Sequence, residues 1–264
     1  MKGIILSGGS ATRLFPLTAT TSKQLLPIYD RQMIFYPLNV LVKAGIKDIL
    51  IIIAPEQSGL FLNLLGSIFD KNDIRLEFKV QKNPRGLADA FIVGENFIGK
   101  DNVTMILGDN IFEDDFSAEI KNFKSGGKVF AVKVPDPERS GVVQFDAKMK
   151  ALKIVEKPKE WLSDYAIPGL YIYDNRVIKV AKQVKPSARG EIEIVDIHNW
   201  YLERGELEVG MVKGKWLDAG TFDSLLEAGV YVKEKKLYEK FDPIINRAIV
   251  EFNEEQKKLA KKKL

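Results

Sequence analysis

The sequence predicts an α/β fold in which a doubly wound, mostly parallel (mixed) sheet is flanked by helices. Three observations support this prediction. Short apolar runs rich in β-branched residues, such as 48–53 and 103–107, are typical of parallel strands that are covered on both faces. Segments with a helical pattern alternate with these runs through the first half of the chain. Polar or glycine-containing turns directly follow several runs, at the strand ends where such sheets bind ligands.

The elements expected in the first half follow in order. The apolar run 3–6 predicts a buried first strand. Residues 33–44 are apolar on most faces and precede Gly45, which predicts a buried helix with a glycine stop. The alternation then continues with a strand at 48–53, a helix at 56–69, a strand at 74–81, a helix at 86–97 and a strand at 103–107.

The second half is less regular, and we expect it to extend the sheet and to form a smaller lobe. Short strands are predicted at 129–134, 141–145, 150–155 and 169–173, and helices at 175–184 and 191–204. Residues 217–226 lead into helical sequence that runs to the end of the chain and is interrupted at 242–243.

Composition excludes several classes of protein. The 264 residues include no cysteine, which excludes disulfides, thiolate metal sites and a cysteine nucleophile and suits a cytoplasmic setting. Much of the net charge of +4 lies in the lysine-rich tail 257–263, so a nucleic-acid surface is not implied. No apolar run reaches the ~20 residues that span a bilayer, so we expect no membrane association.

The first strand ends in a turn suited to a polyphosphate. Residues 7–10 read Ser-Gly-Gly-Ser, and such a turn exposes successive N–H groups to phosphate oxygens. Arg13 and Lys23 add two cations just beyond it. The Walker motif is absent because Ala11-Thr12-Arg13 stands in its place, and the dinucleotide fingerprint lacks its third glycine, which disfavours a nicotinamide oxidoreductase.

Other candidates for chemistry lie further along the chain. Asp109 follows a predicted strand, and Asp218 lies in the segment 216–221, which reads Trp-Leu-Asp-Ala-Gly-Thr. Acids at such positions commonly serve local turns, yet two such carboxylates would also suit Mg²⁺. Lys157 reads equally well as a surface ion pair with Glu156. His198 is the only histidine and lies in a predicted helix, so a Ser-His-Asp hydrolase is disfavoured.

Five motifs in order within residues 2–227 resemble those of the sugar-1-phosphate nucleotidyltransferases. They are the segments 2–27, 107–110, 155–158, 186–191 and 216–221. Residues 22–30 are similar to the glucose-1-phosphate thymidylyltransferase branch of that family. The resemblance implies a Rossmann-like nucleotidyltransferase domain over 1–227, with a nucleotide half to about 134 and a sugar-phosphate half from about 135. Residues 228–264 would form a C-terminal helical extension.

The resemblance also implies roles for individual residues. The catalytic set would be Arg13, Lys23, Asp109, Lys157 and Asp218, and the two aspartates would bind the cofactor Mg²⁺. Nucleotide-binding positions would be Leu6, Gly8, Gly9, Ser10, Ala11, Thr12, Arg13, Gln24, Gln81, Gly86 and Asp109. Sugar-phosphate-binding positions would be Gly141, Glu156, Lys157, Ile167, Tyr171 and Arg189.

The implied reaction is nucleotidyl transfer from dTTP or UTP to glucose 1-phosphate with release of pyrophosphate, in a homo-oligomer (dimer or tetramer). Another sugar 1-phosphate, or a non-catalytic sugar-nucleotide regulator on the same fold, are the alternatives. Three positions depart from the family pattern: Ala11 replaces a glycine, Ser140 a tyrosine and Pro168 a threonine. The C-terminal region is shorter than in typical members, so we expect a feedback site formed there to be lost or altered.

Overall fold

The computed structural model describes residues 1–9, 11–66 and 73–262, and its centre is strand β1 (Lys2–Ser7). β1 pairs in parallel with β4 (Asp48–Ile53) on one side and with β6 (Val103–Leu107) on the other, and β5 (Arg75–Val80) continues beyond β4. Alternate side chains of β1 enter two separate apolar cores, which is why the run is apolar throughout.

The sheet becomes mixed beyond β6. Strand β12 (Leu170–Tyr173) is antiparallel to both β6 and β8 (Gly127–Lys133). The order then continues through β11 (Tyr165–Ile167), β9 (Gly141–Phe145) and β10 (Ala151–Glu156), while β13 (Leu207–Met211) pairs in parallel with β8. One ten-stranded sheet therefore carries strands from both halves of the chain, and the predicted α/β class with a mixed sheet is confirmed.

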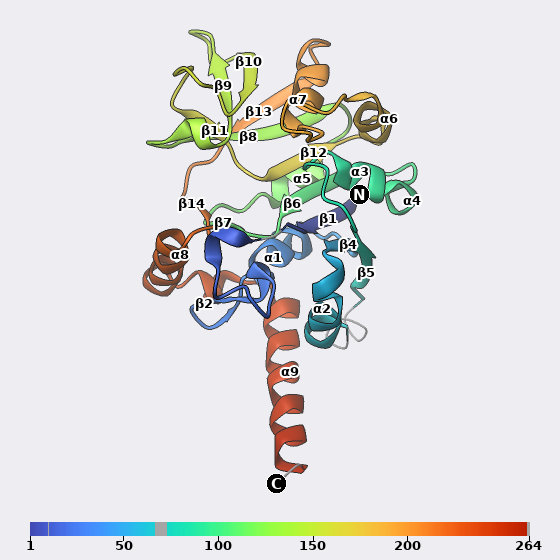
Figure 1. The fold of residues 1–264 in the computed structure, drawn as a ribbon, viewed down its shortest axis with the longest axis vertical. Coiled ribbons are helices and arrows are strands. Elements are labelled where there is room, and N and C mark those ends of the chain that lie inside the picture. Colours follow the sequence, from blue (N-terminus) through green and yellow to red (C-terminus); the bar gives the residue numbers. More distant parts are fainter. Residues whose placement is uncertain (10, 67–72, 263–264) are drawn as a thin grey trace.

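Helices cover both faces of this sheet (Figure 1). One core includes side chains from α1 (Phe35–Lys43), α2 (Ser58–Leu65), α5 (Ser117–Asn122), α8 (Phe222–Lys235) and α9 (Pro243–Lys262). The other includes side chains from α3 (Asp89–Val93), α4 (Glu95–Ile98), α6 (Arg176–Gln183) and α7 (Ile194–Leu202). The far end of α9 extends away from the body, and no helix in the described ranges is long and apolar enough to cross a membrane.

Several short elements were not predicted. They are the helix α5, the strands β7 (Asn110–Phe112), β11, β13 and β14 (Trp216–Asp218), the hairpin β2 (Pro27–Ile28) with β3 (Arg31–Gln32), and the 3-10 turns Thr12–Leu14, Lys23–Leu25, Pro55–Gln57, Pro137–Arg139 and Leu237–Lys240. Segments of two to six residues are too short to show a periodic pattern. The helix predicted at 86–97 is divided at Gly94 into α3 and α4, and residues 67–69 of the helix predicted at 56–69 lie outside the described residues.

The predicted domain boundaries fall at two different kinds of position. Residue 134 comes directly after β8, whereas residue 227 lies inside α8, whose turns continue without a break to Lys235. The division into a nucleotide half, a sugar-phosphate half and an extension stays a prediction.

Candidate active site

The site lies at the point where the strand order reverses. The chain moves from β1 to β4 and β5 on one side and then returns to place β6 on the other, which leaves a crevice beyond the ends of β1 and β6. Gly108 follows β6 and lies against Ser7 at the end of β1, since a Cβ on Gly108 would be 2.6 Å from the Ser7 hydroxyl. The two turns predicted to bind ligand are therefore adjacent.

The turn after β1 has the backbone expected of a phosphate loop. Gly9 has a φ of 106°. Ala11, which stands where the family pattern has glycine, has a φ of 47° in the left-handed region. Holding an alanine there costs roughly 1–2 kcal/mol, so the surrounding structure imposes this conformation in spite of the side chain. Thr18 contributes by donating its hydroxyl to the Ala11 carbonyl at 3.0 Å. Ser10 lies outside the described residues.

The residues predicted to contact the base gather beside this loop. Gln24 and Gln81 are both buried, and the Gln81 carbonyl oxygen would be 3.2 Å from a Cβ on Gly8. The Gln81 amide donates to Asp89 at 2.6 Å, which fixes the orientation of the side chain. Gly86 has a φ of 106° and packs closely on the backbone of Ile192, whose carbonyl would be 2.5 Å from an added Cβ.

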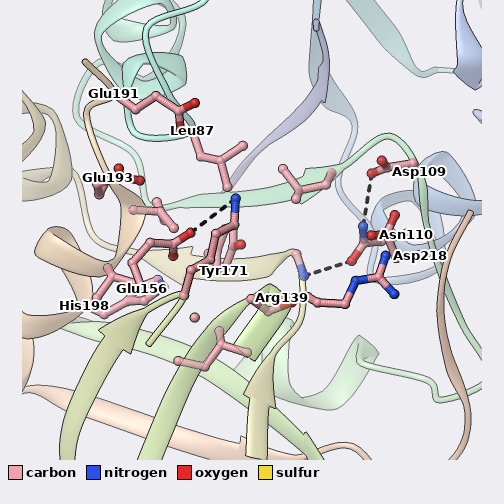
Figure 2. Close-up of a pocket in the computed structure, with 18 of the residues that line it drawn as sticks. Leu87, Asp109, Asn110, Arg139, Glu156, Tyr171, Glu191, Glu193, His198 and Asp218 are labelled. Carbon is pink, nitrogen blue, oxygen red and sulfur yellow. Dashed lines mark hydrogen bonds and ion pairs between the residues drawn. The ribbon is translucent and has the colours of Figure 1, made fainter. Parts of the chain in front are cut away.

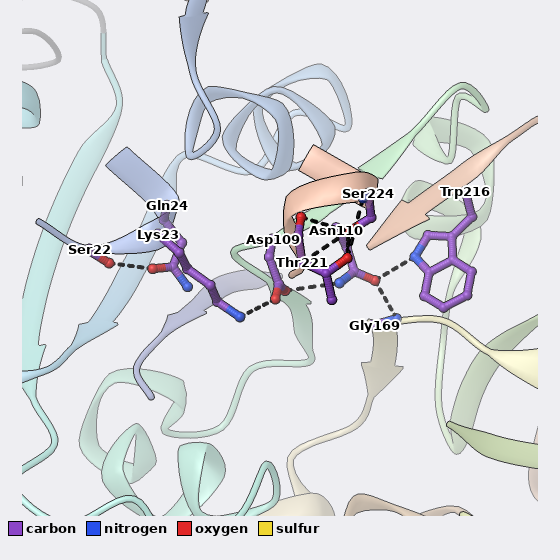
Figure 3. Close-up of polar contacts among 9 residues, drawn as sticks. All are labelled: Ser22, Lys23, Gln24, Asp109, Asn110, Gly169, Trp216, Thr221 and Ser224. Atoms are coloured by element: carbon purple, nitrogen blue, oxygen red, sulfur yellow. Dashed lines mark hydrogen bonds and ion pairs between the residues drawn. The ribbon is translucent and has the colours of Figure 1, made fainter. Parts of the chain in front are cut away.

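The structure brings Asp109 and Asp218 together through a short antiparallel pairing. Strands β7 and β14 align Asn110 with Asp218, and the Ala219 N–H donates to the Asp109 carbonyl at 3.1 Å. Asp109 forms an ion pair with Lys23 and accepts a hydrogen bond of 3.1 Å from the Asn110 amide (Figure 3). Strands of three residues therefore bring together two acids that lie 109 positions apart in the sequence.

The two carboxylates differ in their electrostatic environment. Burial, reinforced by the negative charge of Asp109, raises the pKa of Asp218 to about 6. Burial alone would raise the pKa of Asp109. The charge and hydrogen bond of Lys23, together with the hydrogen bond from Asn110, outweigh burial and hold this pKa below its usual value. One oxygen of Asp218 is buried and has no hydrogen-bond partner. Two adjacent acids with an unpartnered buried oxygen fit a divalent cation with oxygen ligands.

The protein offers two ligands for such a cation, Asp109 and Asp218. In the described ranges no group of three or more histidine, aspartate or glutamate side chains is close enough to hold a metal ion. Mg²⁺ usually keeps several waters and takes one or two carboxylates together with substrate phosphates, so two acids suffice for it. Asp109 and Asp218 are the residues that would hold such an ion.

Asn110 and Gly220 complete this end of the site. The Asn110 side-chain oxygen accepts from the Trp216 indole at 2.7 Å and from the Gly169 N–H at 2.8 Å, which joins β14 to the start of β12 (Figure 3). A Cβ on Gly220 would lie 2.9 Å from the Arg13 guanidinium and 3.0 Å from an Asp218 oxygen. Gly220 therefore leaves room for Arg13 beside the acid pair.

A cavity of about 270 Å³ extends from the acid pair toward α7 (Figure 2). Its lining includes the predicted residues Arg13, Asp109, Gly141, Glu156, Lys157, Ile167, Tyr171 and Asp218. Leu6, Gly8, Gly9, Ala11, Thr12, Lys23, Gln24, Gln81, Gly86 and Arg189 do not line it. The residues predicted to bind sugar phosphate, except Arg189, thus share one cavity with the two predicted metal ligands. Of the predicted nucleotide-binding residues only Arg13 and Asp109 line this cavity.

Arg189 and Lys157 converge on Glu156 at one wall of this cavity. The Arg189 guanidinium contacts Glu193 at 2.8 Å and Glu156 at 3.2 Å, and Lys157 lies 4.0 Å from the same Glu156 oxygen. Burial, with the nearby charge of Glu193, raises the pKa of Glu156. A substrate phosphate would therefore meet two cations that carboxylates hold in place.

Comparison with known proteins identifies the chain. A family model described as nucleotidyl transferase matches residues 2–235. The chain belongs to this nucleotidyl transferase family. A glucose-1-phosphate thymidylyltransferase of Neisseria gonorrhoeae is 54% identical over 240 residues, which cover 88% of this chain and 83% of that protein. The enzyme of the same name from Mycolicibacterium smegmatis is 49% identical over 242 residues, covering 90% and 84%.

Solved structures agree with this assignment. A Bacillus anthracis protein described as a glucose-1-phosphate thymidylyltransferase, in complex with a sucrose, has a TM-score of 0.85 at 42% identity and covers 93% of this chain and 99% of that one. A UDP-glucose pyrophosphorylase complexed with UDP-glucose has a TM-score of 0.77 at 24% identity, covers 89% and 98%, and shares the fold. The predicted family resemblance and fold are confirmed.

The sequence did not identify several cavity residues of this family member. Asn110 is adjacent to Asp109, and Trp216 opens the motif that contains Asp218, so their positions were a usable signal. No motif or pattern in the sequence pointed to Arg139 or Glu193. Arg139 pairs with Asp136 at 2.8 Å, and its guanidinium points toward Asp218 in Figure 2.

Proposed function

We propose that this chain transfers a nucleotidyl group from dTTP, or from UTP, to glucose 1-phosphate and releases pyrophosphate. The observation that supports this most directly is the shared cavity, which has an acid pair and Arg13 at one end and Glu156 with Lys157 at the other. The relatives that are 49% and 54% identical carry the corresponding name. We also propose that the protein is a homo-oligomer and that it works in the cytoplasm.

The reaction needs no nucleophile from the protein. An oxygen of the sugar phosphate forms a bond to the α-phosphorus of the triphosphate, the α–β phosphoanhydride bond breaks, and pyrophosphate leaves with the bonding electron pair. The obstacles are alignment and repulsion between anions, which favours positioning and electrostatic stabilisation as the source of rate. The single histidine is a weak base, because burial lowers the pKa of His198 to about 3.

Each charged residue then has a defined task. Lys157 and Arg189 would hold the attacking phosphate, with the guanidinium fork able to engage two of its oxygens. Arg13 and the loop N–H groups would neutralise the departing pyrophosphate, and Lys23 would reach the α-phosphate from its position beside Asp109. When bound by Asp109 and Asp218, Mg²⁺ would supply positive charge to the phosphate oxygens.

The remaining residues would confer selectivity. Gln24 and Gln81 offer carboxamides, which donate and accept at once as the imide edge of a pyrimidine requires. Glu156 would accept hydrogen bonds from sugar hydroxyls, and Gly141, Ile167 and Tyr171 would line the sugar. Thymine differs from uracil by one methyl group, which gives only about 1–3 kcal/mol of discrimination, so the two triphosphates must be compared directly.

The test is pyrophosphate release by the purified chain with five triphosphates (dTTP, UTP, ATP, GTP and CTP). Each is paired with glucose, galactose, mannose or N-acetylglucosamine 1-phosphate. We expect the highest kcat/KM with a pyrimidine triphosphate and glucose 1-phosphate. Asp109→Asn should lose activity by at least about 100-fold, an effect typical of removing an electrostatic group. The control Asp101→Asn changes an exposed acid in the same way and should keep its activity. Binding without turnover for every pair would instead indicate a sugar-nucleotide regulator.

A further inference from the structure

The only histidine of the chain lies in the wall of the cavity and has an unused nitrogen. His198 is on α7 and completely buried. Its Nδ1 is 2.5 Å from the Tyr173 hydroxyl, whereas its Nε2 is buried with no hydrogen-bond partner. Buried polar atoms without partners are rare in folded proteins, so each one calls for a physical reason.

The available donors and acceptors indicate which ring nitrogen of neutral His198 carries the proton. If the Tyr173 hydroxyl donates to Nδ1, the phenol proton is satisfied and only the N–H at Nε2 is left over. If Nδ1 donates instead, the buried phenol proton and the Nε2 lone pair both lack partners. The first arrangement leaves fewer unpaired groups. His198 is then a neutral side chain with a free donor at Nε2, and its pKa of about 3 keeps it neutral across the working range of pH.

The surroundings of His198 belong to the sugar side of the cavity. Val195, one turn earlier on α7, and Glu156 both border Gly141, where an added Cβ would be 3.0 Å from Val195 and 3.5 Å from a Glu156 oxygen. The Tyr171 ring lies 5.2 Å from the imidazole, centroid to centroid. His198 and Glu156 both line the cavity, and in Figure 2 both lie at the end away from the acid pair.

We propose that His198 is a specificity-determining residue whose Nε2–H donates to a hydroxyl oxygen of the bound hexose. This inference rests on the proposed function, because the cavity is taken to hold the sugar of a sugar 1-phosphate. The hydroxyl completes the hydrogen bonding of a group that is otherwise left unpaired. A sugar without that hydroxyl leaves the donor buried and unpaired, and it is disfavoured for that reason.

Two substitutions separate the halves of the imidazole. His198→Asn places an amide oxygen where Nδ1 stands, so it keeps the bond from Tyr173 and removes the donor at Nε2. His198→Gln reaches further and places an amide near Nε2, so it can restore the donor. Melting temperatures and circular dichroism spectra show whether both variants are folded.

The kinetic experiment compares glucose 1-phosphate with its 2-, 3-, 4- and 6-deoxy analogues. For one position, the wild-type kcat/KM should fall about tenfold or more on loss of the hydroxyl, as expected for an unpaired buried donor. In His198→Asn that difference should disappear at the same position and persist at the others, and in His198→Gln it should largely return. An identical pattern of discrimination in all three proteins would overturn the inference and leave the proposed function intact.

A spectroscopic experiment provides a readout that a purely structural role would not change. With ¹⁵N-labelled histidine the protein gives signals from one imidazole only, because the chain has a single histidine. We expect the Nε2-protonated tautomer, and a shift of the Nε2 signal when glucose 1-phosphate is added but not when the critical deoxy analogue is added. A shift without turnover would contradict the proposed function alone, whereas turnover without a shift would contradict the role of His198 alone.

Discussion

Replacing Asp218 by asparagine should stabilise the metal-free protein while abolishing its activity. The carboxylate is mostly buried beside Asp109, and one of its oxygens has no partner. Asparagine has nearly the same shape, removes the charge and presents an N–H donor toward Asp109. The variant therefore loses the group that would bind the metal and also loses a repulsion that the folded state otherwise carries.

The magnitude follows from the pKa. In the unfolded chain the carboxyl group ionises at its ordinary pKa of 3.8, whereas in the folded protein burial and Asp109 raise the pKa to about 6. Ionisation thus lowers the stability of the wild type progressively as pH rises through this window, and the full loss applies above it. A shift of about two pKa units corresponds to roughly 3 kcal/mol, which is about 5 °C in melting temperature for a chain of this size.

Thermal unfolding in EDTA at pH 8 and pH 4 tests this reasoning. Asp218→Asn should melt about 5 °C above the wild type at pH 8 and within a degree or so of it at pH 4. MgCl₂ should raise the melting temperature of the wild type and of the control Asp101→Asn, but not that of Asp218→Asn. A lower melting temperature for Asp218→Asn at pH 8 would show that Asp218 does not carry an uncompensated buried charge. Near-normal turnover of this variant would show that Asp218 is not needed to bind the metal.

Three further predictions concern other parts of the molecule. Arg13→Ala should lower kcat by about 100-fold or more without changing the melting temperature, because its exposed side chain acts on pyrophosphate; steady-state kinetics and calorimetry would contradict this if the stability changed instead. Gly86→Ala should destabilise the fold by about 2 kcal/mol or more, since its φ is 106° and a Cβ would be 2.5 Å from the Ile192 carbonyl; an unchanged denaturant midpoint would disprove it. Because burial lowers the pKa of His198 to about 3, the unfolded chain takes up a proton that the folded chain refuses as pH falls below about 6.5. The wild type should therefore lose roughly 2–3 kcal/mol more than His198→Asn between pH 7.5 and 4.5, and equal pH slopes in denaturant titrations would exclude this.

Local sequence was sufficient for the elements that carry their own signal. The runs 48–53 and 103–107 form strands with the predicted bounds, because a strand buried on both faces is apolar at nearly every position. The run 141–145 also has the predicted bounds, although it is only partly buried. The turn at 7–9 and the acid at 109 could also be located, since both directly follow such strands.

Other parts of the site depended on contacts between distant segments. Asp218 reaches Asp109 only because β14 pairs with β7, and a three-residue strand has no periodicity that could predict its partner. Asn110 joins three segments through a single side-chain oxygen, and its neighbour Asp109 was the more obvious candidate in the sequence.

The sequence by itself determined the fold class and the family, and it pointed to most of the charged residues that line the cavity, because these follow from local patterns of hydrophobicity and from short motifs. Tertiary structure alone decided which charges neutralise one another, such as Glu193 with Arg189, and which polar groups are left unpaired, such as Nε2 of His198. The physical reason is that pairing and burial depend on what the folded chain places within a few ångströms, and separation along the sequence does not encode that distance.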